Sequence, residues 1–314
     1  MFTLNKIQFG KTYLIELRND ATGEFVTILP DMGASLHQIS LVCNNSLHPL
    51  LWAVEDEDEL YKEGLSQYKG ALLFPFVDRI ESGKYVFEGV EYTLPCNEAN
   101  HKNALHGFLN NKPFQILQST ADEERVSASF FFDYDGGLQG FPFSCTVTII
   151  YTLNANGFSC NTSIQNKSNR NMPVGMGWHP YFRTNSGHSQ FEISIRAVAS
   201  FVIREDYINT GLQAPFHDAD KFLNIGNFSF NAFALNQINN EAKMILRDKA
   251  KKIDIVLNSI GFPFLQVYVV AEKAVAIEPL TCIGNAFNNS IGLKILSPDE
   301  IMKNSFEVML KVMG

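Results

Sequence analysis

Two residues of the sequence have the types and surroundings of a general acid–base pair, Glu278 and His179. Glu278 ends the apolar run 274–277 and precedes a proline. Partial desolvation there would raise its pKa, and a general base works best when its pKa approaches the working pH. His179 lies between Trp178 and the Pro-Tyr-Phe segment 180–182, and an imidazole can take or give a proton near neutral pH. Each residue also has a structural interpretation, as a salt bridge that caps a strand and as a hydrogen-bonded core histidine.

Two further residues could bind the hydroxyl groups of a ligand. Arg79 follows the Phe-Pro-Phe-Val segment 74–77, and its guanidinium could hold a hydroxyl, or pair with Asp78 or a distant acid. His106 precedes a glycine and could contact a hydroxyl or cap a turn. His101 stands five residues earlier, but no carboxylate or cysteine motif accompanies the two histidines, so a metal site is not expected.

Several common site signatures are missing from the sequence. It contains no G-x-G-x-x-G after a strand, no G-x-x-x-x-G-K-[ST], no H-E-x-x-H and no G-x-S-x-G. These motifs are typical of nucleotide-binding, zinc-peptidase and serine-hydrolase sites. The sequence therefore favours none of those classes.

Composition and charge restrict the partners and the compartment. The net charge of −8 disfavours binding to nucleic acid and to anionic membranes. No run of about 18 apolar residues predicts a membrane span, and the first residues do not resemble a signal peptide. The five cysteines are widely spaced, without a C-x-x-C pair, which is typical of reduced, structural thiols. A cytoplasmic protein is expected.

The elements that position these residues are expected to be strands. Residues 143–153 alternate strictly, with apolar side chains on one face and mostly hydroxyls on the other. Residues 191–197 and 306–312 alternate similarly, and Asn156-Gly157 predicts a hairpin turn. Helical periodicity is confined to short stretches such as 55–60. The chain is therefore predicted to be all-β, with stacked antiparallel sheets.

Four short segments, taken in order, resemble the aldose 1-epimerase (galactose mutarotase) family. That family carries an Asn-Arg-Ile segment followed by Gly and an aromatic residue, then His-Gly, then His-x-Tyr-Phe and a late Glu-Pro. In this sequence the segments read Asp78-Arg79-Ile80, His106-Gly107, His179-Pro180-Tyr181-Phe182 and Glu278-Pro279. Their order and spacing match over roughly residues 25–310, which is nearly the whole chain.

The resemblance implies a large antiparallel β-sandwich of the galactose mutarotase-like supersandwich type, formed by residues 1–314 as one domain. It implies an isomerase that interconverts the anomers of a free aldohexose such as glucose or galactose. Glu278 then falls on the family's catalytic base and His179 on its catalytic acid. No metal or other cofactor is expected, and the partner is a small sugar bound by a monomer or homodimer.

The resemblance also implies a set of substrate-binding residues. They are Arg79, His106, Gln266, Asp78 and Asn231. Two of them depart from the family pattern. Asp78 stands where the family usually has Asn, and Asn231 is the nearest match to a sugar-binding Asp, with Asp218 and Asp220 as less well placed candidates. These departures bear on the sugar more than on the chemistry.

Two other functions are compatible with the same scaffold. A non-catalytic carbohydrate-binding protein would need neither an acid nor a base, so the presence of both Glu278 and His179 disfavours it. An epimerase of a sugar phosphate or another modified hexose would need additional basic residues near Arg79 to bind a dianion. The neighbouring sequence offers only Lys84.

Overall fold

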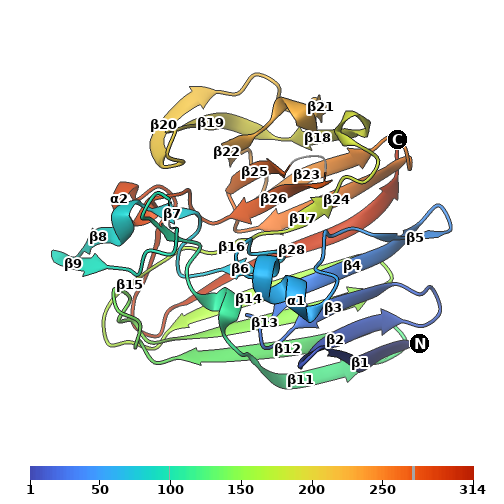
Figure 1. The fold of residues 1–314 in the computed structure, drawn as a ribbon, viewed down its shortest axis with the longest axis horizontal. Coiled ribbons are helices and arrows are strands. Elements are labelled where there is room, and N and C mark those ends of the chain that lie inside the picture. Colours follow the sequence, from blue (N-terminus) through green and yellow to red (C-terminus); the bar gives the residue numbers. More distant parts are fainter. Residues whose placement is uncertain (99, 271–272) are drawn as a thin grey trace.

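The computed structural model describes residues 1–98, 100–270 and 273–314. Its largest sheet has nine strands (Figure 1). In spatial order they are β11 (Gln115–Ala121), β12 (Arg125–Tyr134), β13 (Cys145–Asn154), β14 (Gly157–Asn166), β28 (Ile301–Val312), β24 (Ile253–Ile260), β23 (Glu241–Asp248), β18 (Phe191–Ile195) and β21 (Leu223–Asn224).

An eight-stranded sheet carries most of the residues of interest. Its members are β20 (Asn209–Pro215), β19 (Ala197–Ile203), β22 (Phe230–Leu235), β25 (Phe264–Val270), β26 (Ala274–Leu280), β16 (Gly177–Trp178) and β6 (Leu72–Leu73), with β17 (Tyr181–Arg183) also paired to β26. A five-stranded sheet joins β1 (Phe2–Phe9), β2 (Thr12–Asn19), β3 (Phe25–Leu29), β4 (Ser35–Cys43) and β5 (Ser46–Pro49). This third sheet packs on the first, because β2 contacts β12 and β13, and β4 contacts β28.

The remaining elements are short. Three two-stranded ladders pair β7 (Arg79–Ile80) with β10 (Ala104–Leu105), β8 (Lys84–Phe87) with β9 (Val90–Thr93), and β15 (Met172–Val174) with β27 (Lys294–Leu296). Among the described residues, the named helical segments are α1 (Glu57–Glu59), a π-helical turn at Leu60–Gly64, α2 (Ala286–Asn289), and 3-10 turns at Glu81–Gly83, Leu109–Asn111, His188–Gln190 and Ile225–Asn227.

The predicted all-β, antiparallel architecture is confirmed, and so are its best-patterned elements. The predicted strand 143–153 lies mostly in β13, which begins two residues later at Cys145 and ends at Asn154, and its apolar face is buried. β13 and β14 make a hairpin in which Asn154 pairs with Gly157 across a two-residue turn. The expected short helix lies at α1, where the side chain of Asp56 caps the first turn by accepting from the N–H of Glu59.

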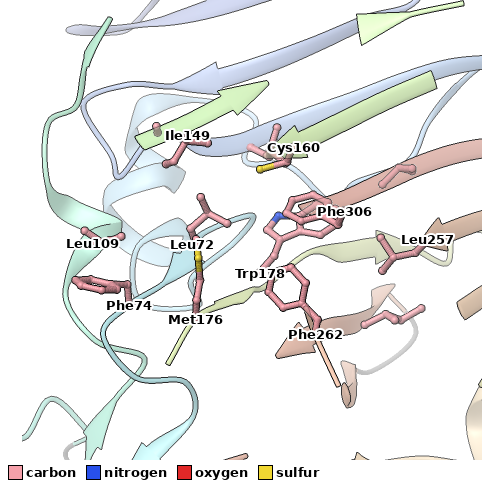
Figure 2. Close-up of a cluster of buried hydrophobic side chains, with 14 of the residues drawn as sticks. Leu72, Phe74, Leu109, Ile149, Cys160, Met176, Trp178, Leu257, Phe262 and Phe306 are labelled. Atoms are coloured by element: carbon pink, nitrogen blue, oxygen red, sulfur yellow. The ribbon is translucent and has the colours of Figure 1, made fainter. Parts of the chain in front are cut away.

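The core lies between the sheets and joins strands far apart in sequence. Figure 2 shows its centre, where Trp178 of β16 stacks on Phe306 of β28 at 4.2 Å between ring centroids. Met176 and Phe262 lie beside this pair in the view, and both are fully buried. The core therefore fixes β16 against the nine-stranded sheet, and β16 leads directly into His179.

Candidate active site

A cavity of about 340 Å³ opens on one face of the eight-stranded sheet. It is lined by Ser66, Gln67, Tyr68, Asp78, Arg79, Leu105, His106, His179, Tyr181, Tyr207, Phe230, Gln266, Tyr268, Val270 and Glu278. Six of the seven residues that the sequence predicted as catalytic or substrate-binding are therefore brought together, although they are spread over two hundred positions of the chain. We call this space the first cavity.

Glu278 lies on β26, and the alternation of that strand points its side chain into the first cavity. In the pairing with β25, Glu278 is opposite Gln266 and Ala276 is opposite Tyr268. Gln266, Tyr268 and Glu278 all line the cavity, whereas Ile277 packs in the hydrophobic core. Because successive side chains of a strand point to opposite faces, β26 contributes to the core and to the cavity at once.

His179 directly follows β16, next to a core residue. Trp178 is fully buried against Phe306, and His179 lines the cavity. The backbone of His179 is held on both sides: its N–H donates to the carbonyl of Ala71 at 2.9 Å, and its carbonyl accepts from the N–H of Gly70 at 3.0 Å. These two hydrogen bonds fix the position of the backbone that carries the imidazole.

Glu278 and His179 face each other, with 3.5 Å between Oε1 and Nε2 and exposed fractions of only 3% and 5% for the two side chains. Burial raises the pKa of Glu278 well above its ordinary value; the charge of Asp78 raises it further, and Arg79 lowers it. Burial lowers the pKa of His179 to about 3. In the free protein these shifts favour a protonated carboxyl beside a neutral imidazole over an ion pair.

His106 is held as a neutral hydrogen-bond donor. Its Nδ1 accepts from the backbone N–H of Asp78 at 3.1 Å, so the proton of the neutral ring resides on Nε2. Burial, with help from His179 and Arg79, lowers the pKa of His106 well below its ordinary value. The ring lines the first cavity and can donate its Nε2–H to an oxygen atom of a ligand.

Arg79 is fixed by two carboxylates and two aromatic rings. Its Nη1 donates to Oδ1 of Asp78 at 2.7 Å, and its Nε and Nη2 donate to Oε1 of Glu98 at 2.9 and 2.7 Å. The guanidinium carbon lies 5.0 Å from the ring centre of Tyr207 and 5.4 Å from that of Phe230. The charge is thus compensated, and the remaining N–H groups can still reach a ligand.

Asp78 is placed to orient Arg79 rather than to lie free in the cavity. Its backbone is left-handed, with φ +49°, a conformation that Asp and Asn adopt more readily than most residues. Its Oδ2 packs against Gly284, where a Cβ atom would come within 2.3 Å of that oxygen. Burial raises the pKa of Asp78 to about 6, although the Arg79 guanidinium lowers it.

Asn231 is the predicted sugar contact that the structure leaves out of the cavity. It pairs with Val267, a core residue of β25, so it lies on the face of the sheet opposite to Gln266. Its Oδ1 accepts from the N–H of Ser229 at 3.0 Å. The neighbouring Phe230 lines the cavity instead. The structure therefore places Asn231 outside the first cavity, one position along β22 from a residue that lines it.

Three aromatic residues that sequence reasoning missed form one side of the cavity, which we call the aromatic wall. They are Tyr207, Phe230 and Tyr268, with ring centroids 5.2 Å apart for the first two and 5.9 Å for the last two. Phe230 stands in β22, whose buried face carries Phe233 as well, and Tyr268 stands among apolar residues of β25, so the pattern did not assign either ring to the cavity. Tyr207 lies in the turn between β19 and β20, where no periodicity exists.

The described residues form no metal site, no disulfide and no membrane-spanning helix. Within residues 1–98, 100–270 and 273–314, no three His, Cys, Asp or Glu side chains come together as a metal site would require. The five cysteines are free thiols, as the sequence predicted. None of the helices in the described part of the chain is both long and apolar enough to cross a membrane.

Comparison with known proteins decides the family. The family model described as Aldose 1-epimerase matches residues 13–308. The chain belongs to the aldose 1-epimerase family. The resemblance inferred from the four sequence segments is thereby confirmed, and the protein is an epimerase that acts on carbohydrates.

Relatives of this epimerase include characterised and uncharacterised proteins. It is 27% identical to the uncharacterized protein YihR of Escherichia coli over 288 residues, or 88% of this chain and 87% of that protein. It is 30% identical to the galactose mutarotase of Rattus norvegicus over 158 residues, which are 47% of this chain but only 43% of that relative.

Solved structures share the fold of this epimerase over its full length. A galactose mutarotase-like protein from Clostridium acetobutylicum superposes with a TM-score of 0.86 at 20% identity, covering 99% of both chains. The galactose 1-epimerase of Lactobacillus acidophilus gives 0.81 at 15% identity and covers 100% of both. At these identities the likeness shows the fold, which agrees with the supersandwich that the sequence predicted.

Proposed function

We propose that this epimerase interconverts the α and β anomers of a free, neutral aldohexose such as glucose or galactose. The observation that carries the proposal is the opposed pair of Glu278 and His179, 3.5 Å apart in a largely buried setting. Ring opening of a hemiacetal requires one proton to leave O1 and another to reach the ring oxygen O5. A carboxylate and an imidazole side by side can serve both atoms of one sugar.

Opening of the ring starts from the ionised pair. Glu278, as the carboxylate, takes the proton of O1 while His179, as imidazolium, gives its proton to O5. The C1–O5 bond breaks, and C1 becomes an aldehyde. The pair is left as a neutral carboxyl and a neutral imidazole, which is the state that burial favours in the free protein. Burial therefore favours the same protonation state of Glu278 and His179 that the pair has while the open-chain sugar is bound.

Closure of the ring reverses these transfers after rotation about the C1–C2 bond. His179 takes back the proton of the O5 hydroxyl as that oxygen attacks the other face of C1, and Glu278 returns its proton to O1. Each well-placed proton transfer contributes about 10²–10⁴-fold to the rate. Besides the two proton transfers, only the C1–O5 bond breaks and re-forms, and the sugar is neither oxidised nor reduced, so the proposed reaction consumes no redox cofactor.

The other lining groups would hold the sugar during this exchange. The N–H groups of Arg79 and the Nε2–H of His106 can donate to sugar hydroxyls, and Gln266 lies opposite Glu278 in the sheet. The aromatic wall offers a surface for the C–H face of a pyranose. Holding the hydroxyls keeps the open-chain form in place until it recloses.

A neutral sugar suits the charges of the first cavity better than an anionic one. Among its lining residues in the described part of the chain, Arg79 is the one Lys or Arg side chain. Asp78 and Glu98 already accept hydrogen bonds from its guanidinium. A phosphorylated sugar would meet Glu278 and Asp78 without an uncompensated cation.

Polarimetry of freshly dissolved α-D-glucose and α-D-galactose tests the proposal. We expect the wild type to speed equilibration of at least one sugar, and Glu278→Gln to lower kcat by about 10²–10⁴-fold. Glu307→Gln is the matched control, because Glu307 is exposed on β28 and lines no part of the first cavity. Equilibration no faster than in buffer, or full activity of Glu278→Gln, would contradict the proposal.

A further inference from the structure

Tyr181 stands next to the proposed base in the first cavity. It belongs to β17 and pairs with Ala276 of β26, two positions before Glu278. Ala276 and Glu278 share one face of β26, because side chains alternate along a strand. Side chains at such diagonal positions of neighbouring strands can reach one another when one of them is aromatic. The phenol of Tyr181 is therefore within reach of the space in front of Glu278.

A small residue leaves room for the Tyr181 ring over β26. The ring packs with the buried side chains of Ala274 and Ala276. On its other side, Ala276 pairs with Tyr268 of β25. The methyl group of Ala276 therefore lies between two tyrosines, and both of them line the first cavity. Because Ala276 is short, both rings can lie close to the strand that carries Glu278.

The ring of Tyr181 is held in place by two other rings. It lies 4.8 Å from the ring of His179, at an angle of 41°, and Trp52 meets it edge-on at 5.9 Å. The backbone carbonyl of Tyr181 also accepts from the N–H of Trp52 at 2.7 Å. Only 5% of Tyr181 is exposed. The phenol is therefore fixed before a ligand arrives, which is what makes a hydrogen-bond donor effective in catalysis.

The hydroxyl group of Tyr181 has no hydrogen-bond partner among the described residues. In the same cavity, by contrast, the hydroxyl of Tyr68 donates to the carbonyl of Leu105 at 3.2 Å and accepts from Nδ2 of Asn97 at 2.7 Å. Burial, together with the charge of Glu278, raises the pKa of Tyr181 above its ordinary value, so the phenol stays protonated and can donate. Because buried phenols normally have a partner, this unpaired donor in the lining points to an oxygen atom of a ligand.

The proposed mechanism indicates which oxygen that is. Glu278 takes the proton of O1, so O1 of a bound sugar must lie within hydrogen-bond reach of its carboxyl. The same oxygen then lies beside the phenol of Tyr181. During opening, O1 gains negative charge as its proton leaves and before the C1=O double bond is complete. During closure, O1 gains negative charge again as O5 attacks C1. A donor at O1 would stabilise both transition states.

We propose that Tyr181 is a third catalytic residue, whose hydroxyl donates a hydrogen bond to O1 of the bound aldohexose while the ring opens and closes. The phenol keeps its proton throughout, and the two protons still move through Glu278 and His179. The hydrogen bond is strongest when O1 carries negative charge, so it accelerates the reaction more than it strengthens binding. The inference rests on the proposed function, because O1 must face Glu278.

Tyr181→Phe removes the hydroxyl and keeps the ring that packs against His179 and Trp52. In polarimetry with the aldohexose that the wild type converts fastest, this variant should lower kcat by about 10- to 100-fold, the range for a hydrogen bond to a charged group. Tyr151→Phe is the matched control, because Tyr151 is buried and donates from its hydroxyl to the carbonyl of Ala34 at 2.8 Å, but does not line the first cavity. It should keep the wild-type kcat, and circular dichroism checks the folding of both variants.

A ligand without O1 separates this contact from a general change in the cavity. The 1,5-anhydro derivative of the same hexose keeps the ring oxygen and the other ring hydroxyls but has no hydroxyl on C1. In calorimetric titration, Tyr181→Phe should weaken binding of the hexose by about 2- to 10-fold and leave binding of the anhydro derivative unchanged.

Two results would overturn the inference while the proposed function stands. They are a wild-type kcat in Tyr181→Phe, and an equal loss of affinity for the hexose and for its anhydro derivative. Failure of the proposed function is recognised separately, because the wild type would then convert no aldohexose, and the inference would fall with it.

Discussion

Replacing Asp78 by Asn should make the protein more stable at neutral pH. The carboxyl group of Asp78 is 95% buried, with an exposed fraction of 5%, and burial raises its pKa from 3.8 to about 6 in spite of its bond to Arg79. The charged form of Asp78 therefore lowers the free energy of unfolding. Asn keeps the shape and the acceptor oxygen, tolerates the left-handed backbone and carries no charge.

The magnitude follows from the pKa shift. A change from 3.8 to about 6 corresponds to roughly 3 kcal/mol, because one pKa unit is about 1.4 kcal/mol. The sign is fixed by the direction of the shift. A carboxyl whose pKa is raised on folding stabilises the folded state fully below its unfolded pKa, and this stabilisation is lost as the pH rises through about 6. The variant should gain up to about 3 kcal/mol over the wild type above that pH.

Urea unfolding between pH 4 and pH 8 measures this difference. The free energy of unfolding of Asp78→Asn should exceed that of the wild type increasingly as the pH rises through about 6, and then level off. Asp58→Asn is the control, because the Asp58 side chain is 85% exposed. A variant that is less stable than the wild type at pH 7, or a difference that does not change with pH, would refute the argument.

Four other experiments probe the rest of the site. Because the folded state keeps His179 neutral with a pKa of about 3, the free energy of unfolding of the wild type minus that of His179→Asn should fall by about 2 kcal/mol from pH 6.5 to 5; urea unfolding of both proteins measures it. The kcat of Asp78→Asn should reach its alkaline decline at lower pH than the wild type, since the charge of Asp78 raises the pKa of Glu278; a pH–rate profile shows it. Glu98→Gln should raise KM about tenfold with a smaller effect on kcat, because Arg79 loses a charged acceptor; initial rates decide. Dialysis against EDTA should leave the polarimetric rate unchanged.

The strands could be predicted from the sequence because their faces have different surroundings. β13 is buried on one face and partly exposed on the other, and its residues alternate accordingly. The strand around Glu278 gives no such signal, since every residue of β26 is buried. There a carboxylate among apolar residues shows that something unusual is present, but not which face it points to. The order of four motifs along the chain supplied what periodicity could not.

The position of Asn231 outside the first cavity escaped prediction for the same physical reason. A shift of one residue along a strand moves a side chain to the opposite face of the sheet. The segment that includes Phe230 and Phe233 has apolar residues on both faces, because one face lines the cavity and the other the core. The polar residue between them was the natural choice for a sugar contact. Residues in turns, such as Tyr207, follow no periodic pattern in the sequence. Whether they contact the cavity depends on the path of the turn relative to the sheet.

The buried acidic groups of the first cavity lower the stability of the folded protein, although the proposed reaction needs a buried carboxyl. Glu278 and Asp78 are both buried, and burial raises the pKa of each; the charge of Asp78 raises the pKa of Glu278 further, and Arg79 is the nearby cation that lowers both. A site selected for stability alone would replace them with neutral residues. Buried carboxyl groups are expected where a proton must be exchanged near neutral pH. The burial that destabilises the charged form also brings the pKa of the carboxyl closer to the pH at which the enzyme works. The stability gained by Asp78→Asn therefore measures the burial of the Asp78 charge, and the earlier alkaline decline of its kcat measures the effect of that charge on Glu278.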